Sequence, residues 1–144
     1  MKKKDIFSCY DINDYEIMTS EMQDKGYKMF YINGKEICTI KKFFSYIKDI
    51  FPLDPPLSGS VNFDAFIDSL WSGLDNQEAD KIAIIWKYPN ELMSQDMDGF
   101  EKLVQCIFEV AENLSSEEYG SNKLIVLKVF FLGKGPFFTR WNKN

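Results

Sequence analysis

Apolar side chains in the first third of the chain recur first with the period of a strand and then with that of a helix. Residues 28–32 are aromatic and β-prone, and Asn33-Gly34 follows them with residue types that tolerate the positive φ of a tight turn. After Thr39, apolar residues recur at steps of three and four, which predicts an amphipathic helix that Thr39 caps and Pro52 ends. The apolar face of this helix consists of Ile40, Phe43, Phe44, Ile47 and Phe51.

An irregular loop over residues 53–61 is predicted to lead into a second amphipathic helix. Three of the chain's five prolines fall within residues 52–56, where they prevent regular structure. Asn62 follows as the expected N-cap, and the apolar residues after it again recur at helical spacing. One face of this helix carries Asp64 and Asp68, and the other carries Phe63, Phe66, Ile67, Leu70, Trp71 and Leu74.

Two further strands are predicted, one before and one after a long helix. Residues 81–87 form a continuous apolar run between charged ends, which is typical of a central strand covered on both faces. A proline-containing break and a short helical turn separate this strand from a longer helix, which either Asp96 or Asp98 caps. A polar loop over residues 115–122 then leads to a β-branched and aromatic segment, 123–132, which we predict to be the third strand.

The order of these elements is strand, helix, loop, helix, strand, helix, strand, which predicts an α/β fold. The helical connections are long enough to join parallel strands, so we expect a small three-stranded parallel sheet with packed helices. Weak apolar spacing in residues 1–25 indicates a peripheral N-terminal extension with one helix or a hairpin. We therefore expect this extension, one domain over residues 26–132, and a basic aromatic tail over 133–144 that either packs on the domain or extends its sheet edge.

The composition excludes several kinds of chemistry and indicates a cellular compartment. The 144 residues include no histidine, which rules out Ser-His-Asp and Cys-His catalysis and zinc sites that need imidazole. The three cysteines form no CxxC pair, and the odd number suits a reducing cytoplasm. The lysines at residues 2–4 are followed by Asp5 and by no apolar stretch of signal-peptide length, so we expect a cytoplasmic protein with no membrane association.

Charge is distributed very unevenly along the chain. Residues 54–120 contain 14 acidic and 3 basic side chains, a balance of −11, whereas residues 121–144 contain five basic side chains and no acidic one. So negative a region repels a nucleic-acid backbone and attracts a basic protein. We therefore expect no direct binding of nucleic acid through this region, although an acidic surface also serves simply to keep a protein soluble.

Asp64 and Asp68 are the most prominent candidate functional pair. Four residues apart on a helix, their carboxylates project from the same side, and only Asp64 lies in the first turn, where the helix dipole favours an anion. A solvated helix face is the simpler explanation for both. The pair has no evident acid partner and no third carboxylate at a metal-binding spacing, so we expect no catalytic residues, no metal site and no cofactor.

Two segments stand out together: Tyr-Ile-Asn-Gly-Lys-Glu-Ile at 31–37 and Gly59-x-x-Asn62-Phe-Asp64-Ala-Phe-x-Asp68. Through these motifs the chain resembles the barstar family, small inhibitors of barnase-type ribonucleases, over residues 28–132. Two features depart from the family pattern. One extra residue separates Gly59 from Asn62, and Leu57 or Ser58 and Ile67 stand where the family commonly has aromatic residues.

The resemblance implies a mechanism in which an acidic helix and its preceding loop enter the active site of a nuclease. Asp64 and Asp68 match the two aspartates of that helix, and Glu109 falls where the family has a glutamate on its last helix, although it is equally explained as an ordinary surface residue. The resemblance thus predicts a non-enzymatic immunity protein that occludes a cognate basic toxin, most simply a ribonuclease. The alternatives are an interaction domain with a non-nuclease partner and, as a weaker rival, a Mg²⁺-dependent enzyme. The predicted partner-binding residues are Leu57, Ser58, Gly59, Asn62, Asp64, Ile67, Asp68 and Glu109.

Overall fold

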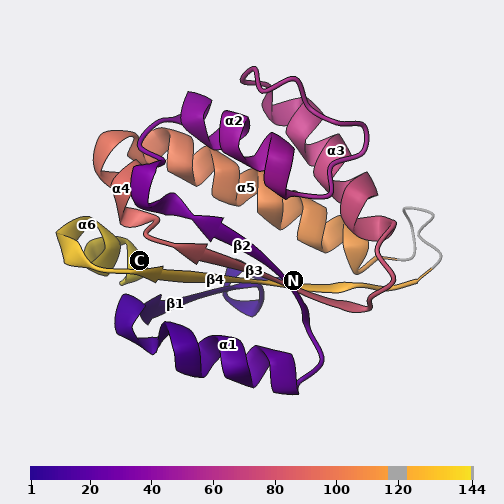
Figure 1. Ribbon diagram of the computed structural model, residues 1–144, viewed down its shortest axis with the longest axis horizontal. Helices are drawn as coiled ribbons and strands as arrows, with labels where there is room; N and C mark the ends of the chain where they lie inside the picture. The colour runs from indigo at the N-terminus through magenta and orange to yellow at the C-terminus, as the bar shows by residue number, and fades with distance from the viewer. Residues whose placement is uncertain (117–122, 144) are drawn as a thin grey trace.

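A parallel sheet forms the centre of the computed structural model, which describes residues 1–116 and 123–143 (Figure 1). The sheet has four strands in the order β1-β4-β3-β2, and each pair of neighbours is parallel. Parallel neighbours require long connections that cross a face of the sheet, and helices supply them here. The strands are β1 (Phe7–Asp11), β2 (Lys28–Asn33), β3 (Lys81–Lys87) and β4 (Val126–Gly133).

The parallel α/β fold is confirmed, but the predicted number of three strands is wrong. The additional strand is β1, which pairs with β4 from Phe7 opposite Val129 to Asp11 opposite Gly133. This strand is short, lies at the edge of the sheet and has no fully buried side chain, so it shows no clear alternation of apolar and polar residues. Its position at the edge explains why the sequence of residues 1–25 indicated only a peripheral segment.

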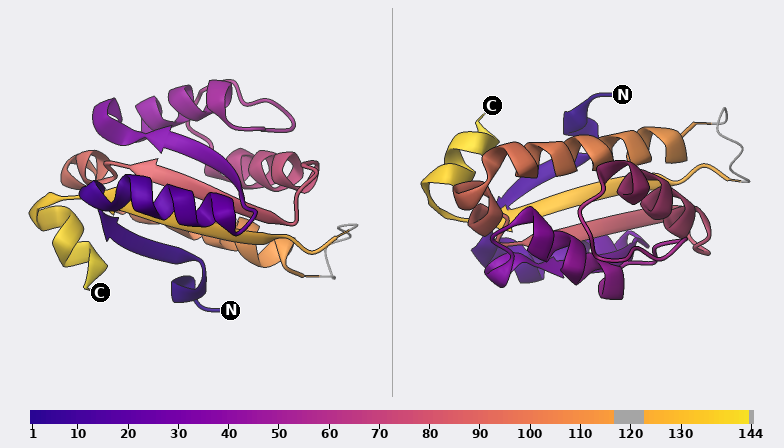
Figure 2. Two further views of the ribbon diagram at one scale, coloured as in Figure 1. Left: turned by 60° about the horizontal axis from the view of Figure 1, so that its bottom comes forward. Right: turned by 90° about the horizontal axis from the view of Figure 1, so that it is seen from above.

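Helices cover both faces of the sheet (Figures 1 and 2). On one face lie α2 (Ile40–Ile50), α3 (Phe63–Asp75) and α5 (Met97–Leu114), and α1 (Tyr15–Asp24) lies on the other. The larger core is rich in aromatic rings, whereas Met18 and Met22 of α1 pack with Ala83 and Ile85 of β3 on the opposite face. Both faces of β3 are therefore buried, as its continuous apolar run predicted.

The predicted helix starts are confirmed by side-chain caps. Thr39 accepts a hydrogen bond from the backbone N–H of Lys42 at 3.1 Å, and the side chain of Asn62 accepts one from Ala65 at 3.0 Å. Of the two candidates for the start of α5, Asp96 is the cap, because its carboxylate accepts from the N–H of Gly99 at 2.9 Å. These caps fix where each helix begins.

The turn after β2 forms for a different reason from the predicted one. Gly34 does not have a positive φ and instead begins the short 3-10 helix η3 (Gly34–Glu36). A Cβ atom at this position would lie 2.6 Å from the carbonyl oxygen of Lys87 and 2.7 Å from that of Tyr88. Glycine is needed here because two segments of backbone approach each other closely.

The C-terminal tail packs on the domain rather than extending the sheet. It forms α6 (Gly135–Asn142), in which Phe138 is buried and Trp141 meets Phe100 and Phe131 edge-on, with ring centroids 5.2 and 5.3 Å apart. A short helix, α4 (Asn90–Gln95), follows β3 as predicted. The polar loop predicted for 115–122 lies, from residue 117 on, outside the described residues. None of the helices in the described ranges is both long and apolar enough to cross a bilayer.

Candidate partner-binding site

The first part of the proline-rich loop is fixed against α3. The backbone N–H of Asp54 donates to the carbonyl oxygen of Ser69 at 3.0 Å, and the Asp54 carboxylate accepts from the side-chain amide of Asn76 at 3.0 Å. At Gly73 the contact is closer still, since a Cβ atom there would lie 1.3 Å from the carbonyl oxygen of Pro52. Only glycine allows the loop to approach α3 this closely. The loop is thus held in place by backbone contacts and by its own carboxylate.

The second part of the loop forms a tight turn before the helix. The hydroxyl groups of Ser58 and Ser60 lie 2.8 Å apart, and Gly59 between them has a φ of +94°, a conformation that favours glycine. The side chain of Lys48 on α2 lies against this glycine, where a Cβ atom would meet its Cδ at 3.2 Å. Leu57 is half-buried against the main core. The loop therefore presents Ser58 and Ser60 to solvent from an ordered turn.

Asp64 and Asp68 project from α3 into solvent. Both are exposed, and no hydrogen bond or ion pair engages either carboxylate within residues 1–116 and 123–143. Lys81, a conceivable internal partner, instead donates to the carbonyl oxygen of Lys25 at 3.0 Å. Asp68 also stands between two shallow hollows, one towards the loop at Pro56 and Leu57, the other towards α5 and lined in part by Ile67, Trp71 and Asn113.

Glu109 is brought to the same region although it lies on a different helix. It is exposed on α5, three residues after the buried Cys106. Burial, together with the negative charges of Glu109 and Asp64, raises the pKa of the Cys106 thiol to about 11. The start of α3 and the middle of α5 are neighbours, because the two helices pack side by side (Figure 2) and Lys102 of α5 lies over the ring of Phe63.

The comparison with protein families decides the identity of this fold. The model of the family described as barstar (barnase inhibitor) matches residues 27–130, well over half of the chain. The chain belongs to the barstar family. The comparison with curated proteins gave no match.

The barstar-family match contains the whole candidate site. It runs from the start of β2 into β4 and so includes the loop, α3 and Glu109. Both β1 and α1 lie outside it, as does α6. The residues that the resemblance singled out thus lie on one surface of the matched region, carried by the loop, by α3 and by α5.

The barstar-family resemblance did not point to several neighbours of this surface. Trp71 is half-buried beside Asp68, and its indole Nε1 is buried with no hydrogen-bond partner in the described part of the chain. Asp54 and Asn113 line the same hollow. Helical spacing placed Trp71 on the apolar face of the helix, which is correct for its ring. The spacing does not indicate that the indole N–H has no hydrogen-bond partner in the described part of the chain. Asp54 and Asn113 carry no spacing signal, because they come from a loop and from the end of another helix.

The candidate site holds exposed carboxylates on two helices that pack against each other. A neighbouring cation, Lys102, lies over the ring of Phe63 at 5.9 Å. Among the described residues, no group of three or more cysteine, aspartate or glutamate side chains is placed to hold a metal ion. Exposed carboxylates that no ion pair engages in the described ranges favour association with a positively charged partner.

Proposed function

We propose that this protein is a non-enzymatic inhibitor that binds a cognate toxin, a ribonuclease, and occludes its active site with α3 and the preceding loop. The observation that carries the proposal is that Asp64 and Asp68 on α3 and Glu109 on the adjoining α5 are all exposed, while no ion pair engages them in the described ranges. Membership of a family of barnase inhibitors supports the same conclusion. The contact residues are Leu57, Ser58, Gly59, Asn62, Asp64, Ile67, Asp68 and Glu109.

The chemistry of the partner explains why carboxylates serve as the contact groups. A ribonuclease stabilises a phosphoryl transition state with arginine and lysine side chains, so its empty active site is strongly positive. Carboxylates held at fixed positions can pair with those cations and take the place of RNA phosphates. The acidic surface then competes directly with the substrate.

The anchoring of the loop lowers the entropic cost of binding. A flexible loop loses conformational freedom when it docks. This loop is already ordered, because its residue Asp54 accepts hydrogen bonds from Ser72 and Asn76 and because Gly59 forms a tight turn. Leu57 and Ser58 can therefore contact a partner without first being ordered. The same rigidity fixes the distance from the loop to Asp64 and Asp68, which makes the surface selective for one geometry of cations.

The protein acts in the cytoplasm of the cell that makes it. Cys9, Cys38 and Cys106 are all free thiols in the structure, which suits a reducing compartment. An inhibitor kept there meets its toxin before export or after entry. This location also favours a tight and fast interaction, since a single unblocked nuclease would damage cellular RNA.

An interaction domain with a non-nuclease partner is the second candidate. It is favoured by Ile67 and by Leu57 or Ser58, which stand where the family commonly carries aromatic residues. Aromatic side chains often dominate the energetics of an interface, so their replacement changes which partner fits. The acidic surface would remain the contact region in either case.

Inhibition kinetics separate the two candidates. The full-length chain is titrated against a panel of basic ribonuclease domains, beginning with any nuclease encoded beside its gene, while cleavage of a fluorogenic RNA is followed. We expect complete loss of cleavage at a one-to-one ratio, with an apparent inhibition constant that rises linearly with RNA concentration. Binding that leaves cleavage intact favours the second candidate. Inhibition that is independent of RNA concentration contradicts occlusion of the active site.

A further inference from the structure

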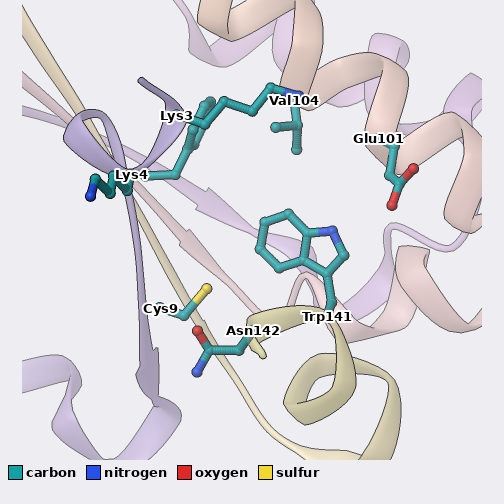
Figure 3. A pocket seen from close by; sticks show the side chains of 8 residues that line it. Lys3, Lys4, Cys9, Glu101, Val104, Trp141 and Asn142 are labelled. Carbon is teal, nitrogen blue, oxygen red and sulfur yellow. The ribbon is translucent and has the colours of Figure 1, made fainter. Parts of the chain in front are cut away.

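A second cavity, remote from the acidic surface, lies where both ends of the chain meet α5 (Figure 3). Its volume is about 450 Å³, within the usual range for small-molecule sites. It is enclosed by η1 (Lys3–Asp5), β1, α5 and α6. Seen from above in Figure 2, the two termini lie on the side of α5 that faces away from α3. Of the elements that form its walls, only α5 lies within the family match.

One part of the cavity lining is apolar and aromatic, beside the polar side chain of Asn142. Trp141 projects into it from α6 and is held by edge contacts to Phe100 and Phe131 (Figure 3). Phe7 lines the cavity and stacks on Phe131 with ring centroids 5.7 Å apart and an angle of 11° between the rings. An aromatic or aliphatic group placed against Trp141 would therefore meet a preformed apolar surface.

Cys9 contributes to this apolar wall rather than to reactivity. Burial raises the pKa of its thiol to about 11, so the thiol stays protonated and neutral at physiological pH. In Figure 3 its sulfur lies beside the cavity below the indole of Trp141. The cavity is therefore suited to holding a ligand and offers no thiolate to attack one.

The rim is cationic on the side of η1. Lys3 and Lys4 line the cavity; Lys3 extends across its upper edge towards Val104, whereas the amine of Lys4 points away from Trp141 (Figure 3). The acidic group next to them, Asp5, is already engaged, since its carboxylate accepts a hydrogen bond from the backbone N–H of Lys2 at 2.8 Å. That hydrogen bond, together with Lys4 and Lys128, lowers the pKa of Asp5. The remaining charged lining residue is Glu101, on the opposite wall.

We propose that this cavity binds a small amphipathic anion, with its apolar body against Trp141 and Phe7 and its single acidic group paired with Lys3. Glu101 on the far wall repels the acidic group and so orients the ligand towards η1. The cavity arises because segments from both ends of the chain pack against a helix of the family fold. Binding in this cavity would give the N-terminal and C-terminal segments a role separate from that of the acidic surface.

The test uses 8-anilinonaphthalene-1-sulfonate, an aromatic anion whose fluorescence rises in apolar surroundings, as the probe on the full-length chain. We expect saturable one-to-one binding that octanoate displaces and octylammonium, which has the same chain and the opposite charge, does not. Lys3→Glu should weaken probe binding by about tenfold, the size expected for reversing one partly exposed charge contact. The matched variant Lys41→Glu, an exposed lysine on α2, should leave binding unchanged.

A second measurement locates the site without relying on a variant. On addition of octanoate, the indole N–H resonance of Trp141 should shift in a ¹⁵N-resolved NMR spectrum while that of Trp71 stays fixed. Equal displacement by octanoate and octylammonium would overturn the proposal, as would equal binding by the wild type and Lys3→Glu. A shift confined to Trp71 would place the ligand at the acidic surface and would also overturn it.

Discussion

The helices α1 and α3 lie on opposite faces of one sheet, and both carry exposed acidic residues (Figure 1). They differ in how many of their residues are buried and in how their ends and flanks are held. Only Met18 and Met22 of α1 are buried. In α3 five residues are buried, the N-terminus is capped by Asn62, and a loop is fixed along its length. Under the proposed function, the comparison teaches that acidity alone does not define a binding surface. What distinguishes α3 is acidity on a rigid support beside a second helix that brings Glu109.

The largest difference between the two helices should appear in partner affinity. Asp64→Ala and Asp68→Ala should each weaken binding of the inhibited ribonuclease by roughly 2 to 5 kcal/mol, because each leaves a desolvated cation on the partner without its counter-charge. The matched α1 changes, Glu21→Ala and Asp24→Ala, should have no effect. Calorimetric titration measures both sets, and thermal unfolding should show that all four variants fold. Unchanged affinity in the double α3 variant would remove these residues from the interface.

A change at the contact between the loop and α3 should lower the free energy of unfolding much more than a change on the surface of α1. Gly73→Ala places a methyl group on the carbonyl oxygen of Pro52, so the loop must move away, at a cost of about 3 kcal/mol in the free energy of unfolding. Ser20→Ala on the exposed surface of α1 should change it by less than about 0.5 kcal/mol. Urea denaturation measures both. A Gly73→Ala protein of normal stability would mean that the loop is not fixed as described.

Removal of the helix caps should also lower the free energy of unfolding more for α3 than for α1, but by a smaller amount. Asn62→Ala removes a side-chain bond to the N–H of Ala65 and should lower the free energy of unfolding by about 1 kcal/mol. Asp14, at the equivalent position of α1, makes no side-chain cap bond, so Asp14→Ala should cost only a few tenths of a kcal/mol. If urea denaturation gave equal losses of unfolding free energy for Asn62→Ala and Asp14→Ala, the side-chain cap of α3 would add no stability beyond that of the start of α1.

The smallest expected effect concerns the Cys106 thiol. Since Glu109 and Asp64 raise its pKa, Asp64→Asn and Glu109→Gln should lower that pKa and speed alkylation by iodoacetamide at pH 9, by less than about tenfold. Asp24→Asn on α1 should leave the rate unchanged.

The same thiol makes stability depend on pH. A raised pKa means that the folded state holds the proton more tightly, so this contribution is full below pH 9 and is lost as the pH rises towards 11. The fall in unfolding free energy over that range should be smaller in Cys106→Ala than in the wild type. An identical fall in both would show that this thiol contributes nothing to it.

Local pattern was enough to predict the elements that bury a continuous face, and it failed where burial is partial or contacts are distant. The strand over residues 81–87 and the helix after Asn62 were correct because their apolar spacing is unambiguous. The edge strand β1 was missed because its side chains are only partly covered. The proximity of Asp64 and Glu109 could not follow from spacing, since it depends on how two separate helices pack. Only the family resemblance suggested that they act together.

The pairing of β1 with β4 has a consequence for how the protein is made. Phe7 lies opposite Val129, so β1 finds its neighbour only once the chain has been synthesised as far as residue 129. Contacts this far apart in sequence slow folding, because a long chain must close before they form. We therefore expect the sheet to close only after β4 has been synthesised, so that β1 joins the sheet last although it is made first.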